Sequence, residues 1–394
     1  MTPCILPWIN FSTNTFGRAR ACGYSDTKSD AKLRDSSIPE QWNGDYFKTI
    51  RSDFMQGKWP DNCRRCRYVE SLDGISKRME ENGWFYEDNR HLIDQTAPDG
   101  TVPYQPPHMD IRVGTICNLK CIHCGTGASS KWQEDKSLLG KYPNTENYRI
   151  DNKWIEQDSL IWDSMRTGIA HTRKMNFLGG EPFANKQHNR FVREIAETGH
   201  AAHITLSYVT NGLLIDDAMV QTLLKFKNVI MRVSIDAAGL PGEYFRYPMR
   251  WARFVSQLEM LSRYARDNDN IDLGLQWTCS NISMFYLVDT HVEMRKLFPE
   301  LRLLLCNHVE WPQHMSAQVL PQDIKRGIAA QISAHDWGND ATAVSFYVNH
   351  MLAEDMWLDH GHVLLNYLDD LDRARSTDWH SSFADMRLED HDRR

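Results

Sequence analysis

Three cysteines stand close together in the segment VGTICNLKCIHCGTG, as Cys117-x3-Cys121-x2-Cys124. Cysteine thiolates are ligands of structural zinc sites and of iron–sulfur clusters, and both kinds of site normally need four ligands. The fourth ligand must therefore come from elsewhere, either from another side chain on a zinc ion or from a small molecule on an open iron. His123 is wedged between two of the cysteines, where it cannot easily reach the same metal, and this disfavours zinc.

Four further cysteines precede this segment, as Cys4-x12-Gly17-x4-Cys22 and then Cys63-x2-Cys66. In a cytosolic chain of this length, clustered cysteines indicate metal or redox chemistry more often than disulfides. Four thiolates can complete a site without any other ligand. The count fits structural zinc and an iron–sulfur cluster equally well, and the spacing does not decide between them.

The elements that must position these cysteines follow from the pattern of the chain. Residues 96–110 are rich in proline and predict a boundary. Beyond it, short apolar runs alternate with longer amphipathic segments, which predicts right-handed βαβ units and one parallel sheet. The predicted strands are 108–114, 174–179, 203–210, 229–236, 271–278 and 301–307. The predicted helices between them are 151–168, 185–198, 214–226, 249–267 and 284–297.

The expected fold class is therefore α/β, a partial (βα)6 parallel barrel. Residues 1–105 form a small cysteine-rich N-terminal domain with a helix over 39–56, and residues 106–311 form the barrel. Residues 312–394 form a helical C-terminal extension without strands, with helices expected over 321–335, 343–356 and 361–374. In such sheets, ligands bind at the carboxyl ends of the strands.

Polar motifs occur at three of these strand ends. The second strand closes in LGGEP, whose paired glycines allow close approach of a ligand and whose carboxylate can bind an ammonium group. The third ends in VTNG and the fourth in VSID, which offer hydrogen-bonding groups for a ribose or a carboxylate. A plain turn is the alternative interpretation of both Gly-Gly and Asn-Gly. The candidate residues are Gly179, Gly180, Glu181, Thr210, Asn211 and Ser234.

A C-x3-C-x2-C loop after the first strand of a partial parallel barrel resembles the radical S-adenosylmethionine (radical SAM) superfamily. The resemblance implies a [4Fe–4S] cluster held by Cys117, Cys121 and Cys124, whose open iron is chelated by SAM. It further implies that Glu181 binds the methionine amino group, with the other strand-end residues and His123 on the SAM side. An electron from a donor such as flavodoxin or ferredoxin would then cleave SAM to methionine and a 5′-deoxyadenosyl radical.

The N-terminal cysteines and the text LPWINFSTNTFGRARACGYS resemble the twitch domain, the shortened form of the SPASM auxiliary-cluster domain. In well-known members this domain follows the barrel, whereas here it precedes it, as in a twitch-type group found often in phage genomes. The resemblance implies a second, auxiliary [4Fe–4S] cluster, with zinc as the alternative. A cluster with four cysteine ligands has no open iron, so it would transfer electrons or support the structure.

Further candidates follow the last two strands. Cys279 and Cys306 could donate a hydrogen atom to a product radical, although lone cysteines on strands are usually buried apolar residues. His308 and Glu310 could act as acid–base or binding groups, or lie on a surface loop. The segment 242–254 mixes arginines with aromatic residues. It could contact a nucleic acid, or simply begin an amphipathic helix with snorkelling arginines.

The net charge of −7 argues weakly against a protein that coats nucleic acid. No apolar run approaches the length of a membrane span, so a soluble cytoplasmic protein without a membrane partner is expected. The expected activity is radical oxidation or rearrangement of a peptide or small molecule, as an oxidoreductase or isomerase. One alternative is rearrangement of an amino-acid-decorated thymine or another nucleobase, because phages carrying this group often hypermodify their DNA. The other is a metal-binding scaffold without catalytic activity.

Overall fold

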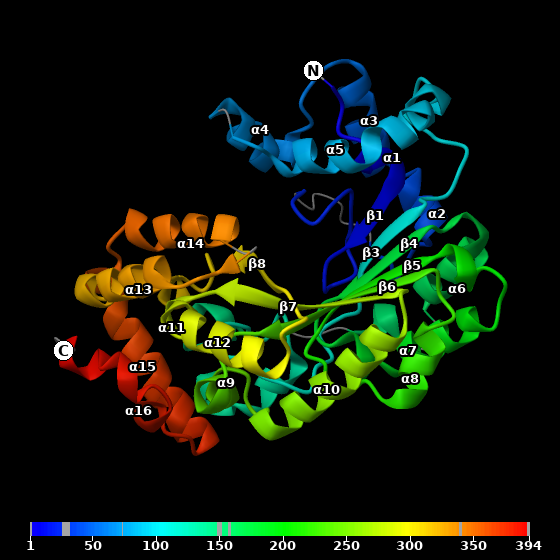
Figure 1. Ribbon diagram of the computed structural model, residues 1–394. Coiled ribbons are helices and arrows are strands. Elements are labelled where there is room, and N and C mark those ends of the chain that lie inside the picture. Colours follow the sequence, from blue (N-terminus) through cyan, green and yellow to red (C-terminus); the bar gives the residue numbers. More distant parts are fainter. Residues whose placement is uncertain are drawn as a thin grey trace. The chain divides into compact units, whose positions relative to one another are not determined.

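The computed structural model describes residues 2–25, 32–72, 74–147, 152–156, 159–338 and 341–391. Eight strands form one sheet in the order β2-β1-β3-β4-β5-β6-β7-β8 (Figure 1). Their bounds are β1 Asn10–Thr13, β2 Ala19–Arg20, β3 His108–Arg112, β4 Lys174–Leu178, β5 Thr205–Thr210, β6 Asn228–Ile235, β7 Ile271–Cys279 and β8 Leu303–His308.

Helices precede, separate and follow the strands. In the N-terminal segment and between β3 and β6 they are α1 Leu6–Ile9, α2 Ile38–Trp42, α3 Asp45–Met55, α4 Arg64–Ser71, α5 Lys77–Asn89, α6 Leu160–Thr167, α7 Lys186–Ala196 and α8 Asp217–Leu223. Between β6 and β8 they are α9 Gly239–Phe245, α10 Trp251–Asp267, α11 Asn281–Phe285 and α12 Leu287–Leu297. After β8 they are α13 Gln322–Ala334, α14 Ala341–Ala353, α15 Trp357–Arg375 and α16 Trp379–Ser382 (Figure 1).

The predicted α/β fold is confirmed. All six predicted strands are present as β3 to β8, and they follow one another in the sheet in chain order. The recorded pairs β3/β4, β4/β5 and β7/β8 are parallel. After β8 the described residues form helices and turns without a strand, as expected for the C-terminal extension. The sheet runs from β2 at one end to β8 at the other.

The two N-terminal strands extend the sheet, which the sequence did not predict. β1 pairs antiparallel with β2, as in a hairpin, and it also pairs parallel with β3. β1 has four residues and β2 has two, so neither carries enough alternation to predict a strand. Ser12 and its partner Asp110 are far apart in sequence, so this pairing is set by tertiary packing.

Side chains alternate along β3, β4 and β5 between a buried apolar face and a half-buried polar face. On β4, Met175 and Phe177 are fully buried, whereas Lys174, Asn176 and Leu178 are half-buried. A strand turns successive side chains to opposite faces. The apolar residues therefore belong to the core, and the other face of these strands offers polar groups.

Two predicted helices differ from the structure. The helix predicted over 39–56 is wrong as a single element, because it is divided into α2 and α3 at Asn43 and Gly44. Gly44 has the extended backbone of an N-cap, with φ −78° and ψ 167°, so α3 starts anew there. Of the helix predicted over 151–168, only α6 is α-helical, and it follows a short 3₁₀ helix at Lys153–Ile155. Residues 151, 157 and 158 lie outside the described part of the chain.

By its internal contacts the chain divides into two compact units. One consists of residues 1–116, 150–208 and 217–230, and the other of residues 117–149, 209–216 and 231–394. The N-terminal cysteines and the Gly179–Glu181 turn belong to the first unit, and the three-cysteine loop and the C-terminal helices to the second. The three-part division at residues 105 and 311 stays a prediction. Among the described helices, none has the length and apolar character needed to cross a bilayer.

Candidate functional site

Cys117, Cys121 and Cys124 lie on a loop after β3, which we call the cluster loop and define as residues 117–125. The backbone amide of Leu119 donates to the Sγ of Cys117 at 3.4 Å. The thiols of Cys121 and Cys124 contact each other, which lowers the pKa of Cys121, and Arg246 contributes in the same direction. The same thiol contact and burial raise the pKa of Cys124. Cys121 is therefore the more acidic of these two thiols.

The segment after α9 pairs with the cluster loop through its backbone. The amide of Lys120 donates to the carbonyl of Tyr247 at 2.8 Å, and that of Ile122 donates to the carbonyl of Phe245 at 2.9 Å. These two bonds place Cys121 opposite Arg246. The Arg246 guanidinium donates to Asp236 at 2.6 Å, and both side chains are buried. A buried cation thus lies beside the loop, held by a carboxylate from the end of β6.

The C-terminal extension also holds the cluster loop. The hydroxyl of Tyr367, on α15, donates to the carbonyl of Ile122 at 2.7 Å. The side-chain amide of Asn144 donates to the carbonyl of Cys124 at 2.6 Å and to the Tyr367 hydroxyl at 3.0 Å. Arg375, at the end of α15, donates to buried Asp135 at 2.8 Å. These bonds fix the loop backbone on the side of α15.

The glycine after the third cysteine has no space for a side chain. A Cβ on Gly125 would lie 1.9 Å from the carbonyl oxygen of Asn144, whose side chain binds Cys124. Three thiols on a loop with fixed backbone and buried arginines nearby suit an anionic iron–sulfur cluster, because cationic groups stabilise its negative charge. The residues present therefore fit the group that the sequence implied.

The Gly179–Glu181 turn is built around the backbone that precedes Cys117. The amide of Glu181 donates to the carbonyl of Ile116 at 2.8 Å. A Cβ on Gly180 would lie 2.3 Å from the same carbonyl oxygen, and Gly180 has a φ of +50°. The turn therefore requires glycine for packing against the chain itself. The Glu181 carboxylate is buried and accepts the amide of Phe183 at 3.1 Å.

Of the other predicted SAM contacts, Asn211 lies beside the cluster loop. Its side-chain amide donates to the side-chain oxygen of Asn118 at 2.7 Å. Thr210 is buried at the end of β5, and Ser234 is half-buried near the end of β6. The His123 ring lies 5.1 Å from that of Phe245, and its Nδ1 has no hydrogen-bond partner among the described residues. Their roles toward SAM stay predictions.

The four N-terminal cysteines converge. Cys4, Cys22, Cys63 and Cys66 line one small cavity, together with Leu6, Phe54, Trp59 and Tyr24. Burial raises the pKa of the Cys4 thiol, and the other three cysteines add to this rise. Lys77 and Arg78 also line the cavity and offer positive charge. A closed metal site fits this arrangement.

The spacing of the sulfur atoms separates a cluster from a single ion. In tetrahedral zinc sites with Zn–S bonds of 2.3 Å, the sulfurs lie about 3.8 Å apart. Across the described residues, the one group of three potential ligands within 4.8 Å of one another is Asp372, Asp378 and His380. No three of the described cysteine sulfurs are that close together, although those of Cys121 and Cys124 contact each other. The four N-terminal sulfurs are thus more widely spaced than the ligands of a zinc site.

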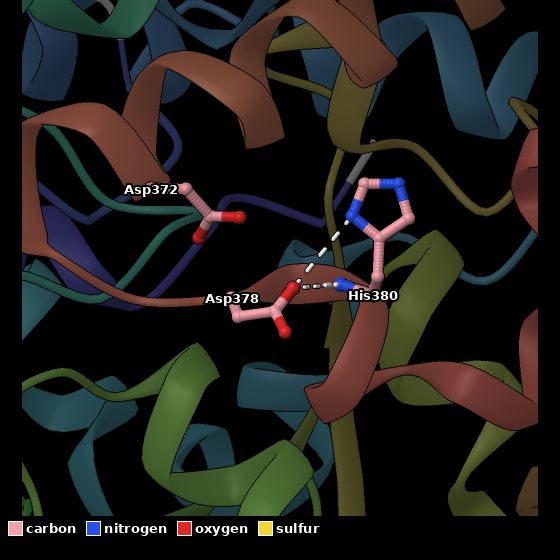
Figure 2. A group of neighbouring side chains, drawn as sticks. All are labelled: Asp372, Asp378 and His380. Carbon is pink, nitrogen blue, oxygen red and sulfur yellow. Dashed lines mark hydrogen bonds and ion pairs between the residues drawn. The ribbon is translucent and has the colours of Figure 1, made fainter.

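The Asp372, Asp378 and His380 group is explained by hydrogen bonding (Figure 2). Asp372 accepts the hydroxyl of Tyr244 at 2.9 Å and the backbone amide of Trp379 at 2.8 Å. Asp378 is the N-cap of α16 and accepts the backbone amide of His380 at 3.1 Å. These carboxylates therefore hold the turn between α15 and α16.

The candidates after the last two strands are only partly described. His308 Nε2 and Glu310 Oε1 lie 3.0 Å apart, so the structure brings these two together. The ring centroid of His350, on α14, lies 4.4 Å from that of His308, and no sequence pattern pointed to it. Cys279 is fully buried at the end of β7. Cys306 lies on β8, and its side chain is outside the described part of the chain.

The arginine–aromatic segment 242–254 is largely used in internal contacts. Tyr244 and Phe245 are buried, and Arg246 is buried against Asp236. Arg250 is exposed and pairs with Glu243 at 3.0 Å. An amphipathic helix does begin at Trp251, as one of the two sequence interpretations expected. The Arg246 side chain does not extend to solvent, in contrast to the snorkelling arginines of that interpretation.

A buried histidine under the Gly179–Glu181 turn predicts acid sensitivity. His188, on α7, packs edge-on against Phe183, and burial lowers its pKa to about 4. Its unfolded pKa is about 6.5, so folding favours the neutral ring. The stabilisation is present above pH 6.5 and is lost as the pH falls toward 4, by up to about 3 kcal/mol.

We expect His188→Gln to flatten the pH dependence of urea unfolding between pH 7 and 4. His200→Gln, at an exposed position, should leave it unchanged.

A family model described as "Radical SAM superfamily" matches residues 111–285. The match includes the end of β3, the strands β4 to β7, the cluster loop and the Gly179–Glu181 turn. It supports an iron–sulfur cluster and SAM binding, and it indicates an enzyme. No curated protein matches the sequence.

Solved structures that the chain weakly matches include Streptococcus suis SuiB bound to S-adenosylmethionine, at 14% identity and a TM-score of 0.39, covering 73% of this chain and 60% of SuiB. Another is anSMEcpe with bound AdoMet and Cp18Cys peptide, at 13% identity and a TM-score of 0.37, covering 58% of this chain and 59% of that chain. SuiB bound to precursor peptide SuiA matches at 13% identity and a TM-score of 0.36, covering 77% of this chain and 64% of that chain. The matches span less than two thirds of those chains, and likenesses this weak assign no substrate. Residues 111–285 are therefore similar to the radical SAM superfamily.

Proposed function

We propose that this protein is a radical SAM enzyme that reductively cleaves S-adenosylmethionine and takes a hydrogen atom from a substrate. The observation that carries the proposal is the cluster loop, with three cysteines, a fixed backbone and a buried arginine opposite Cys121. When bound, a [4Fe–4S] cluster with an open iron supplies the electron for the cleavage. A flavodoxin or ferredoxin would serve as the reductant.

The chain's own residues would bind and orient SAM. Glu181 is buried at the end of β4, with one carboxylate oxygen accepting a backbone amide, and we assign it to the methionine amino group. Asn211 is hydrogen-bonded to Asn118 of the cluster loop, which suits a group that positions SAM. Thr210 and Ser234 would contact the ribose or carboxylate, and the buried His123 ring would pack on the SAM side.

The N-terminal cysteines would hold a second [4Fe–4S] cluster. Their convergence on one cavity and the wide spacing of their sulfurs support a cluster over zinc. We expect Cys63→Ala to remove about four irons per chain, while Cys279→Ala leaves the iron content unchanged. Iron and sulfide analysis of anaerobically reconstituted protein measures this. An unchanged iron content with a loss of bound zinc would contradict the second cluster.

The substrate would be a peptide or small molecule, with a nucleobase of DNA as the second candidate. The internal use of segment 242–254 leaves fewer groups there for nucleic-acid contact, which favours the first. His308 and Glu310, which contact each other after β8, would act as acid–base groups. Oxidation and rearrangement are both compatible with this arrangement.

The test is anaerobic reconstitution followed by addition of dithionite and SAM, with 5′-deoxyadenosine quantified by chromatography. The proposal predicts release of 5′-deoxyadenosine and methionine from reconstituted protein only. Adding DNA separates the two substrate candidates, because a clear rise with DNA would move the substrate to a nucleobase. Absence of 5′-deoxyadenosine from protein with a full iron content would support a metal-binding scaffold and refute the proposal.

A further inference from the structure

A row of polar residues crosses the half-buried polar face of the first four strands. Arg20 on β2 is opposite Ser12 on β1, which is opposite Asp110 on β3. The Asp110 carboxylate accepts the hydroxyl of Ser12 at 3.2 Å and the side-chain amide of Asn176 at 3.2 Å. Its two oxygens are thus used by neutral donors, and it forms no ion pair with a described residue.

Two arginines meet at the end of this row. Arg112 is two residues after Asp110 on β3, so it lies on the same face. The Arg20 guanidinium donates to the carbonyl of Gly23 at 3.2 Å. One guanidinium nitrogen of Arg112 lies 4.0 Å from the position that a Cβ on Gly23 would occupy. Both side chains therefore converge on Gly23.

Neither guanidinium has its charge balanced by an ion pair with a carboxylate of the described residues. The Nε atoms of Arg20 and Arg112 are both buried, and within the described ranges neither has a hydrogen-bond partner. Burial lowers the pKa of Arg20 and the neighbouring charge of Arg112 lowers it further, whereas the carboxylate of Asp110 acts in the opposite direction without forming an ion pair. Two half-buried like charges are costly unless a counter-charge joins them.

A cavity of about 130 Å³ reaches Gly23, the residue on which both arginine side chains converge. Its lining includes Asp110, Glu81 and Lys174, whereas neither arginine lines it. Lys174 begins β4 and adds a further cation to this side of the sheet. Gly179 leaves room for Arg112, because a Cβ there would lie 2.9 Å from the Cβ of Arg112. Paired guanidinium groups with free donors bind carboxylates and phosphates by two parallel hydrogen bonds.

We infer that Arg20 and Arg112 form a binding site for an oxyanion of the substrate, a carboxylate or a phosphate. The inference rests on the proposed function only in calling the ligand a substrate, since the site itself is defined by residues outside the cluster loop. The substrate would then carry a negatively charged group that anchors it against the polar face of β2 and β3. Uncharged substrates would lose this anchor.

The test measures anion binding in the full-length reconstituted protein without SAM or reductant. Thermal unfolding is followed with sodium phosphate and, separately, with sodium acetate, against sodium chloride at equal ionic strength. We expect one of the two anions to raise the melting temperature of the wild type beyond chloride, and the responding anion identifies the chemistry. Arg112→Gln should weaken the apparent affinity for that anion at least tenfold. Arg173→Gln, at an exposed arginine of the same unit, should leave it unchanged.

Removal of Arg112 relieves the repulsion from Arg20, so Arg112→Gln should melt no lower than the wild type in chloride. Should it melt lower, Arg112→Lys keeps the charge without the planar fork and should bind the anion with intermediate affinity. Equal anion responses in wild type and Arg112→Gln would overturn the site.

SAM binding is measured in parallel by equilibrium dialysis. A loss of SAM affinity in Arg112→Gln would assign the pair to the carboxylate of SAM and overturn the substrate assignment. Failure to cleave SAM would refute the proposed function and leave this result standing.

Discussion

Replacing Cys121 with alanine is expected to reduce the formation of 5′-deoxyadenosine to the background of the reaction without protein. Cys121 is the buried middle ligand of the three, and it lies opposite Arg246. The loop would hold a [4Fe–4S] cluster by three thiolates only, and two thiolates would not suffice. About four irons per chain should be lost with it.

The N-terminal cluster should survive this change, because its four cysteines lie on separate segments, 4–22 and 63–66, of the other unit. Iron analysis and the electron paramagnetic resonance spectrum of the dithionite-reduced variant test this directly. Cys279→Ala is the matched control for iron content, since it also removes a buried thiol and should retain the iron. Persistent formation of 5′-deoxyadenosine in Cys121→Ala would refute the assignment of the three cysteines.

Replacing Gly125 with alanine is expected to displace the cluster loop without removing any ligand. The added methyl group would lie 1.9 Å from a backbone carbonyl oxygen, and backbone atoms cannot rotate away as a side chain can. Overpacking of this kind typically costs about 1–3 kcal/mol of unfolding free energy, and more where backbone must move. We expect at least the upper value, together with a loss of most iron from this loop.

The matched control is Gly327→Ala in α13, where an added Cβ meets no atom within 4 Å. Alanine favours a helix over glycine by up to about 1 kcal/mol, so this variant should be as stable as the wild type or more stable. Urea unfolding and iron content, measured on both variants, separate steric displacement from a general effect of alanine. Wild-type iron content in Gly125→Ala would contradict the fit described for this loop.

The parts of the site that could be predicted from the sequence are local in the chain. The spacing of Cys117, Cys121 and Cys124 is readable because one loop carries all three ligands. The strands β3 to β7 are readable because apolar and polar side chains largely alternate along them, and β8 is readable as a short apolar run. The Gly-Gly-Glu turn could be predicted because its three residues are adjacent at the end of β4. Its packing against Ile116 could not be predicted.

The groups that hold the cluster loop could not be predicted, because they are distant in sequence. Tyr367 binds Ile122 from 245 residues away, and a tyrosine inside an amphipathic helix carries no mark of such a bond. Arg246 was visible only as one arginine of an arginine–aromatic segment. Its partner Asp236 lies at the end of another element, so their burial as an ion pair depends on the fold. The pairing of β1 with β3 could not be predicted for the same reason, because the two strands are distant in sequence.

The bond between Tyr367 and the cluster loop has a consequence for the order of events during synthesis. The ribosome completes the cysteines of this loop more than two hundred residues before it adds the tyrosine that holds the loop backbone. Throughout that interval the loop backbone lacks one of its supports. Only after α15 has been made does the nascent chain contain every group that holds this loop.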